Sequence, residues 1–494
     1  GILYTSKADI VGFKNPEELA EKYNNVLYHR HQYARIEIFK NHFYIKEYDE
    51  NVYEIIYKLK KYAESGIKNY THSVDLWMKN SGLIIDCDEK KNALRNLFKN
   101  SKVAFIYGAA GTGKSTMINY ISSLFKDKQK IFLANTNPAV ENLRRKVTAE
   151  HAEFVTITKF LSKDVSNDCD ILCLDECSTI SNRDMVRVLQ RAQCKLLVLV
   201  GDIYQIESIL FGNWFNIAYK VMPKDSVAEL TRPHRTTVQG LIEVWNKVRE
   251  ITEDRLEFIT RNGLSSTLDE SIFSRTEEDE IVLCLNYDGI YGINNINKFL
   301  QSNNVNPSIN WGVLSYKVGD PVLFNESNRF APLVYNNLKG KILQIEEEED
   351  CIYFTIEVYT VLNELDVIGF DLELKESVTD ETSVIRFKVG RGGDGNDDND
   401  NVENVVPFQV AYAISIHKAQ GLEYESVKVV ITSEIEEMVS HNIFYTAITR
   451  AKSKLKIYWS PETEKRILEN MKVQFNDKDY QLFKAKYKEA LLKS

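Results

Sequence analysis

Short apolar runs alternate with amphipathic stretches through the middle of the chain. Runs at 103–107, 131–134, 171–174 and 196–200 are each followed by a stretch with helical periodicity. Runs this short and this apolar are typical of strands that are buried on both faces, and their alternation with helices predicts parallel pairing. We therefore predict a doubly wound α/β domain that begins at about residue 81.

The first 80 residues follow a different pattern. Asn15-Pro16-Glu17-Glu18 is typical of a helix start, and apolar positions between Val52 and Tyr62 fall on one face of a second helix. Tyrosine is frequent here, and half-buried packing of the rings is favoured over stacking on bases. No catalytic pattern is present. We predict an N-terminal accessory segment, 1–80, that leaves room for a protein partner.

The most specific motif lies directly after the first buried strand. Residues 108–116 read GAAGTGKST and lead into a helical stretch, which is the context that a P-loop requires. Glycines let backbone N–H groups turn inward, and the helix adds its positive end. Lys114 then reaches the β- and γ-phosphates, and the Ser115 hydroxyl is placed for Mg²⁺. The predicted nucleotide-binding residues are Gly108, Gly111, Thr112, Gly113, Lys114, Ser115 and Thr116.

Polar residues follow two further strands, at the ends where open α/β sheets bind ligands. Asp175 comes directly after 171–174 and is predicted to hold Mg²⁺, while Glu176 orients the attacking water. Gln205 follows 196–200, and its neutral amide can sense the γ-phosphate. We predict Lys114, Glu176 and Gln205 as catalytic residues, and ATP with Mg²⁺ as the cofactors.

In this order the motifs resemble those of the superfamily-1 helicases, in the branch that contains RecD and Dda. The resemblance extends from about residue 81 to 460. Its motifs are similar to 108–116 (motif I), 135–143 (Ia), 175–178 (II), 201–205 (III), 230–235 (IV), 413–423 (V) and 445–451 (VI).

The resemblance implies an α/β fold with two RecA-like P-loop NTPase domains. A small β-barrel is inserted in the second of them, where short runs such as 318–324, 339–343 and 353–358 are separated by turn residues. The predicted domains are the accessory segment 1–80, the first RecA-like domain 81–230, the second RecA-like domain in two parts, 231–310 and 403–494, and the barrel 311–402.

Further functional residues are likewise implied by the resemblance. Arg235 and Arg450 are the arginines expected at the γ-phosphate, where an arginine finger contributes roughly 10³–10⁵ in rate. Gly421 and Glu423 are expected at the nucleotide. Contacts to single-stranded DNA, with duplex junctions as the further partner, are expected from Asn135, Pro138, Thr158, Ser415 and His417.

Two features depart from the family pattern. Relatives carry a glutamine upstream of motif I that reads adenine, whereas Lys90 stands at that place here. Relatives that split duplexes carry a pin between motifs Ia and II, but the stretch 162–168 is barely long enough for a turn. Phe160 and Tyr204 are candidates for stacking on bases, with core packing as the alternative.

Composition excludes few of the possible functions. The net charge of −9, from 62 basic and 71 acidic residues, excludes a wholly basic binder but not a local basic groove. No apolar run approaches the roughly 18 residues of a membrane span, so no membrane partner is expected. Among the seven cysteines, Cys169, Cys173 and Cys177 are four residues apart, but free thiols in a reducing, cytoplasmic compartment are favoured over a metal site.

The sequence thus predicts an ATP-dependent DNA helicase that moves 5′ to 3′ on single strands, the polarity being implied by the resemblance alone. Two alternatives stay open. One is an RNA-directed helicase of the same branch. The other is a DNA-stimulated ATPase switch that regulates a partner protein with little unwinding.

Overall fold

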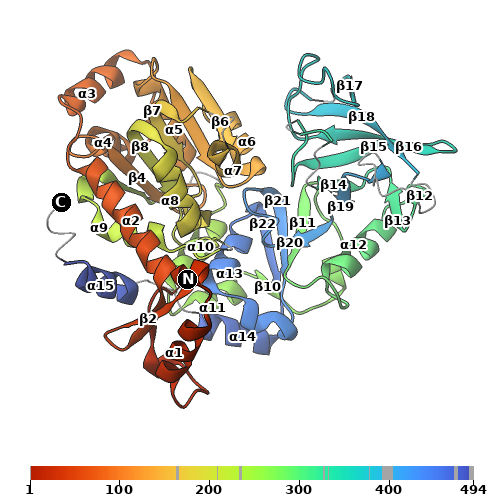
Figure 1. Ribbon diagram of the computed structural model, residues 1–494. Helices are drawn as coiled ribbons and strands as arrows, with labels where there is room; N and C mark the ends of the chain where they lie inside the picture. The colour runs from red at the N-terminus through yellow and green to blue at the C-terminus, as the bar shows by residue number, and fades with distance from the viewer. Residues whose placement is uncertain are drawn as a thin grey trace. The chain divides into compact units, whose positions relative to one another are not determined.

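The computed structural model describes residues 2–162, 166–208, 210–232, 236–325, 329–331, 333–377, 379–391, 404–471 and 477–488. The chain divides into two compact units. The first comprises Gly1–Thr237 and Val473–Ser494, and the second comprises Val238–Lys472. Figure 1 labels their helices and strands. Within the described residues, no helix is both long enough and apolar enough to cross a bilayer.

The first unit is built on a parallel six-stranded sheet with the order β6-β5-β7-β8-β4-β9. All four strands expected from the apolar runs are present, which confirms the α/β fold with parallel strands. The strands are β4 (Val103–Gly108), β5 (Lys130–Ala134), β6 (Ala152–Thr156), β7 (Asp168–Leu174), β8 (Gln193–Gly201) and β9 (Val227–Leu230).

Both faces of this sheet are buried. Because successive side chains of a strand point to opposite sides, each strand contributes to two core clusters. In β4, Val103 and Phe105 belong to one core cluster, whereas Ala104 and Ile106 belong to another. This double burial is the reason that the strands read as continuous apolar runs.

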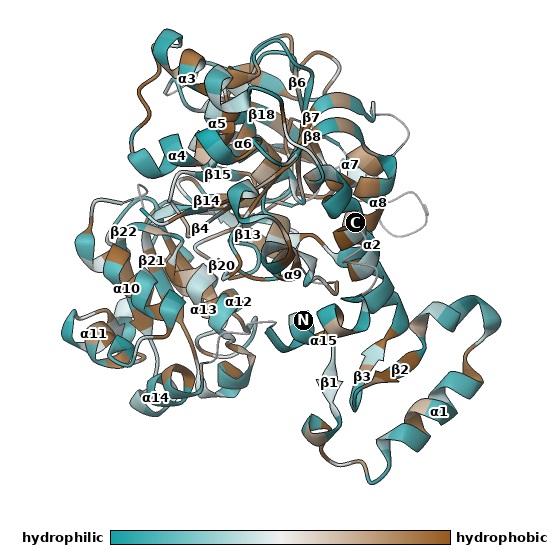
Figure 2. Ribbon diagram, turned by 90° about the vertical axis from the view of Figure 1, so that its left-hand side faces the viewer, coloured by the Kyte–Doolittle hydropathy of each residue, from teal (hydrophilic) through white to brown (hydrophobic). Residues whose placement is uncertain are grey.

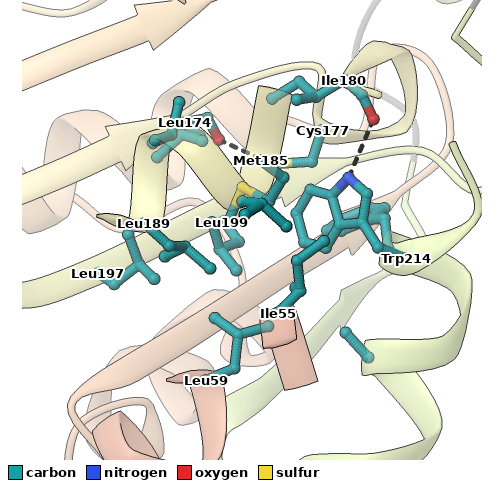
Figure 3. Close-up of a cluster of buried hydrophobic side chains, with 14 of the residues drawn as sticks. Ile55, Leu59, Leu174, Cys177, Ile180, Met185, Leu189, Leu197, Leu199 and Trp214 are labelled. Atoms are coloured by element: carbon teal, nitrogen blue, oxygen red, sulfur yellow. Dashed lines mark hydrogen bonds between the residues drawn. The ribbon is translucent and has the colours of Figure 1, made fainter. Parts of the chain in front are cut away.

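One face is covered by α2 (Lys46–Ala63), α8 (Asn182–Arg191) and α9 (Trp214–Val221). Figure 3 shows Ile55 and Leu59 of α2 in one cluster with Leu199 of β8 and Trp214 of α9. The indole Nε1 of Trp214 donates to the carbonyl of Ile180 at 2.9 Å. Helix α2 therefore supplies part of the core beneath the sheet.

The other face is covered by α3 (Tyr70–Asn80), α4 (Asp88–Asn96), α5 (Lys114–Leu124) and α6 (Asn137–Lys146). Because α2 and α3 pack on opposite faces, residues 46–80 are integral to this unit. The accessory segment predicted for 1–80 is thus only partly separate from the sheet domain.

The outer part of that segment forms a small antiparallel sheet with the order β1-β3-β2. It comprises β1 (Thr5–Ser6), β2 (Ile36–Phe39) and β3 (His42–Ile45), together with α1 (Pro16–Val26), which begins at the proline as predicted. Helix α1 buries only Ala20 and is largely hydrophilic in Figure 2.

The C-terminal helix α15 (Asp477–Lys486) belongs to the first unit, which differs from the predicted boundary of 403–494. The Asp479 carboxylate accepts hydrogen bonds from the backbone N–H groups of Leu3 at 2.6 Å and Tyr4 at 2.9 Å. In addition, Lys486 pairs with the buried Asp49 of α2 at 2.6 Å. These contacts join the two ends of the chain.

The second unit contains a parallel five-stranded sheet with the order β10-β22-β21-β11-β20. The strands are β10 (Ser265–Ser266), β11 (Glu280–Cys284), β20 (Ala413–Ser415), β21 (Tyr424–Val430) and β22 (Ala451–Tyr458). The helices are α10 (Gln239–Glu250), α11 (Arg255–Arg261), α12 (Ile293–Ser302), α13 (His441–Ile448) and α14 (Pro461–Asn470).

Between β11 and β20 the chain forms a hairpin and an antiparallel six-stranded sheet with the order β17-β18-β16-β15-β14-β19. The order leaves β17 and β19 as edges, and no pairing closes them into a barrel among the described residues. The strands are β12 (Ser308–Trp311), β13 (Leu314–Lys317), β14 (Pro321–Phe324), β15 (Lys339–Glu347), β16 (Cys351–Val358), β17 (Glu373–Lys375), β18 (Ser383–Gly390) and β19 (Phe408–Val410).

Candidate nucleotide site and nucleic-acid track

The glycine-rich loop joins β4 to α5, so the strand and the helix expected on its two sides are both present. Gly111 and Gly113 have φ angles of 77° and 86°, a region that side chains with a Cβ rarely adopt. Gly113 is also the N-cap residue of α5. The backbone path of the loop therefore depends on these two glycines.

The Lys114 ammonium lies over this loop. Its Nζ donates to the carbonyl oxygens of Gly108 at 2.7 Å and Ala109 at 2.9 Å. Thr112 is buried, and its hydroxyl donates to the same Ala109 carbonyl at 3.0 Å. Ser115 and Thr116 are half-buried in the first turn of α5. The Lys114 ammonium therefore lies at the loop beside a helix N-terminus, an arrangement that favours an anion.

Asp175 and Glu176 follow β7 directly. Burial raises the pKa of the Asp175 carboxyl, and the Glu176 N–H and the Lys114 charge offset part of that rise. Glu176 has a φ of 52°, which is uncommon for a residue other than glycine and stores backbone strain.

Gln205 lies in the turn after β8, where its N–H donates to the Asp202 carbonyl at 3.3 Å. The buried Asp202 carboxylate accepts from the Tyr204 N–H at 3.0 Å and so stabilises the same turn. A side chain at Gly201 would collide with the Phe215 ring, 2.6 Å from its Cβ. This close packing fixes where the turn leaves the sheet.

The strand order brings these groups to one edge. Strands β7, β8 and β4 are consecutive neighbours and run parallel, so the residues after their carboxyl ends lie together. The sequence-predicted Lys114, Asp175, Glu176 and Gln205 all follow one of these three ends.

Lys90 lies against the same loop, a contact that the sequence did not indicate. Its side chain is 1% exposed, and its Nζ pairs with Asp86 at 2.5 Å. A Cβ at Gly113 would be 2.5 Å from that Nζ. The neighbouring Glu89 accepts hydrogen bonds from both the N–H and the hydroxyl of Thr231, at 3.1 and 2.9 Å.

The three DNA-contact candidates of the first unit differ in exposure. Thr158 is exposed on α7 (Ile157–Leu161), whereas Pro138 is buried in the first turn of α6. Asn135 is exposed, and its amide donates to the Thr179 carbonyl at 3.1 Å. Phe160 is fully buried in the core, so the alternative of core packing holds for this ring and stacking on bases is wrong.

The candidates of the second unit cluster after β20. Ser415 is buried and its hydroxyl accepts from the Lys418 N–H at 3.2 Å, whereas His417 is exposed. Gly421 has a φ of 76°, and Glu423 is half-buried just before β21. The stretch from the end of β20 to the start of β21 therefore contains the predicted DNA contacts together with Gly421 and Glu423.

Arg450 lies directly after α13 and is 3% exposed. Its guanidinium donates to the carbonyls of Thr446 at 3.0 Å and Leu422 at 3.2 Å. The latter bond joins it to the loop that carries Gly421 and Glu423. The other predicted arginine, Arg235, lies outside the described residues, as does the part of the expected pin region at 163–165.

Comparison with known proteins gives matches on both units. The AAA domain family matches residues 87–269, and the UvrD-like helicase C-terminal domain family matches residues 410–458. The RecBCD enzyme subunit RecD of Buchnera aphidicola is 23% identical over 78% of this chain and 78% of its own length. The ATP-dependent DNA helicase Pif1 of Campylobacter jejuni is 23% identical over 72% of this chain and 88% of its own.

The chain is a superfamily-1 helicase homologue of the RecD/Pif1 type. This helicase homologue also matches an uncharacterised protein of Methanocaldococcus jannaschii, at 24% identity over 74% of the chain but only 37% of that protein. Among solved structures, Pif1 helicase from Bacteroides with ADP-AlF₃ and single-stranded DNA has a TM-score of 0.49 at 16% identity, covering 82% of this chain and 98% of that one. Pif1 helicase from Candida albicans has a TM-score of 0.48 at 19% identity, covering 81% and 99%.

Proposed function

We propose that this chain is an ATP-dependent DNA helicase that moves 5′ to 3′ on single-stranded DNA and couples ATP hydrolysis to strand separation. The observation that carries the proposal is the edge of the first sheet, where a P-loop, an acidic pair and a polar turn follow three neighbouring parallel strands. The relatives named as DNA helicases and as RecBCD subunits support the reaction and the substrate.

The residues present fit a nucleoside triphosphate with Mg²⁺. The loop from Gly108 to Thr116 would hold the phosphates through its backbone N–H groups and Lys114. The Ser115 hydroxyl and the Asp175 carboxylate would hold Mg²⁺, which neutralises charge on the phosphates. These are oxygen ligands, the type that Mg²⁺ prefers.

Glu176 is the residue that we assign to orienting the attacking water. Its backbone N–H donates to the Asp175 carboxylate at 2.9 Å, which fixes that carboxylate against the backbone of Glu176. Gln205 would sense the γ-phosphate through its amide, and Arg450 and Arg235 would stabilise the charge that develops there.

DNA contacts are proposed for Asn135, Pro138 and Thr158 in the first unit and for Ser415 and His417 in the second. Hydroxyl and backbone contacts to phosphate carry no sequence information, so binding is expected to tolerate any sequence and to weaken with salt. The antiparallel sheet of the second unit is proposed to correspond to the small β-barrel expected from the resemblance. The seven free cysteines accord with a reducing compartment.

The test combines ATP hydrolysis, measured with and without single-stranded DNA, with strand displacement on duplexes that bear either a 5′ or a 3′ tail. Stimulation by DNA together with displacement from the 5′ tail alone is expected. Stimulation without displacement would indicate the switch, and stronger stimulation by RNA would indicate an RNA-directed enzyme. Displacement from the 3′ tail alone would contradict the polarity.

A further inference from the structure

Lys339, at the start of β15 in the antiparallel sheet, reaches the loop that carries Glu423. Its Nζ pairs with the Asp279 carboxylate at 2.6 Å and donates to the Glu423 carbonyl at 3.3 Å. The ammonium also lies 4.1 Å from the ring centroid of Tyr424 and 5.2 Å from that of Tyr359. Both rings present a negative face to the cation. Lys339 therefore provides a charged contact between the antiparallel sheet and the start of the parallel sheet of the second unit.

Asp279 also bonds to the backbone that follows Glu423. Its other carboxylate oxygen accepts from the Glu425 N–H at 3.1 Å, and its own carbonyl accepts from the Ser426 N–H at 3.1 Å. The Lys339 side chain is only 20% exposed. Because an unpaired charge in such a place is costly, removing the lysine should also release Asp279 from its position.

Arg450 holds this backbone from the opposite side. Its guanidinium donates to the Leu422 carbonyl at 3.2 Å, and its own carbonyl accepts from the Tyr424 N–H at 3.0 Å. The four residues 422–425 are thus fixed between Arg450 and the Lys339–Asp279 pair. A shift of this short stretch would move both Glu423 and Arg450.

We propose that Lys339 is a positioning residue, which acts through Asp279 to fix residues 422–425 and hence to place Glu423 and Arg450 for ATP hydrolysis. The inference rests on the proposed function, which assigns Arg450 to the γ-phosphate, and on the expectation from the family resemblance that Glu423 lies at the nucleotide. It makes the antiparallel sheet a structural support of the ATPase chemistry, in addition to any contact with DNA.

The chain provides a matched control two residues along the same strand. Lys341 pairs with Glu278, which contacts no part of 422–425 among the described interactions. In the 494-residue chain, K339M should lower kcat for ATP by about tenfold while KM stays within about threefold, because misplaced catalytic groups slow the chemical step. K339R, which keeps the cation, should recover most of the rate, and K341M should match the wild type.

Hydrogen exchange supplies a readout that does not depend on activity. The amides of Tyr424, Glu425 and Ser426 should exchange about tenfold faster in K339M than in the wild type or K341M, while exchange in β11 is unchanged. Unchanged exchange at these amides, or faster exchange with an unchanged kcat, would overturn the inference. A wild-type chain without DNA-stimulated turnover would instead contradict the proposed function, and the exchange comparison would still show whether Lys339 fixes residues 422–425.

Discussion

Lys90 offers the sharpest test of a single side chain. An ammonium has donors only, whereas a glutamine amide presents a donor and an acceptor together. Adenine presents one of each on its N6 and N7 edge, while guanine presents two acceptors. Because Lys90 lies at the phosphate loop and is paired with Asp86, we expect little preference for ATP over GTP.

K90Q should shift this balance toward ATP. A bidentate contact to a base contributes about 1–3 kcal/mol of discrimination, so the ratio of kcat/KM for ATP to that for GTP should rise by roughly five- to a hundredfold. Steady-state hydrolysis of the two triphosphates measures this ratio. K91Q is the control, since Lys91 is exposed and pairs with the exposed Asp88. An unchanged ratio in K90Q would remove Lys90 from base selection.

Glu176 is the second test at this scale. E176Q keeps the shape of the side chain but loses the charge that orients and activates water, so kcat should fall by about 10²–10⁴. Binding of a fluorescent ATP analogue should persist, because the amide leaves the phosphate loop intact. K114A, by contrast, should abolish hydrolysis by removing the phosphate contact itself. Turnover at the wild-type rate in E176Q would exclude Glu176 as the water-orienting group.

The sequence predicted the position of contiguous motifs in the fold, while the roles of their residues stay predictions. The loop from Gly108 to Thr116 and the pair Asp175-Glu176 follow their strands as the pattern required. It could not predict the contact between Lys339 and Asp279, because a single ion pair that spans 60 positions leaves no periodic signal. Arg235 lies outside the described residues, and its role stays a prediction.

At the scale of elements, α15 shows how a C-terminal helix joins a distant part of the fold. Asp479 accepts two backbone N–H groups from Leu3 and Tyr4. Burial raises the pKa of this carboxyl, and the backbone N–H groups offset part of that rise. No alternation or heptad could have indicated this pairing, because the partners lie 476 and 475 positions apart.

D479A should therefore destabilise the first unit. Hydrogen bonds to a charged acceptor contribute about 1.5–3 kcal/mol each, and the alanine leaves two buried donors unpaired. Chemical denaturation followed by tryptophan fluorescence measures the change, since Trp214 lies in the core of this unit. K478A is the matched control, because its ion pair with Asp9 is exposed and should contribute little. Equal midpoints for the two variants would contradict this account.

The same pKa shift gives the sign of a pH effect. A carboxyl whose folded-state pKa is raised binds its proton more readily in the folded chain, so its contribution to stability falls as pH rises through its titration range. The difference in stability between D479N and the wild type should therefore move in favour of D479N as pH rises from 4 to 7.

At the scale of the whole molecule, the apolar runs predicted the parallel sheet of the first unit, whereas the boundaries predicted at the two ends of the chain differ from the structure. That sheet was predictable because strands buried on both faces carry continuous apolar runs. The segment 1–80 lacks catalytic motifs, which predicts an accessory role, but the absence of motifs says nothing about packing. In the structure α2 and α3 cover opposite faces of the first sheet.

Deletion of residues 1–80 tests this integration. The truncated chain keeps every predicted catalytic residue, so an accessory role predicts a soluble and active ATPase. The structure predicts the opposite, because removing α2 and α3 exposes apolar surface on both sides of the sheet. We expect aggregation on expression. L59A is a milder change in the untruncated chain and should lower the free energy of unfolding by about 2–5 kcal/mol, because Leu59 is buried. K61A is the control at an exposed position of the same helix and should change that free energy by less than about 0.5 kcal/mol. A soluble truncated chain with wild-type ATPase activity would show that the sheet domain folds without its N-terminal helices.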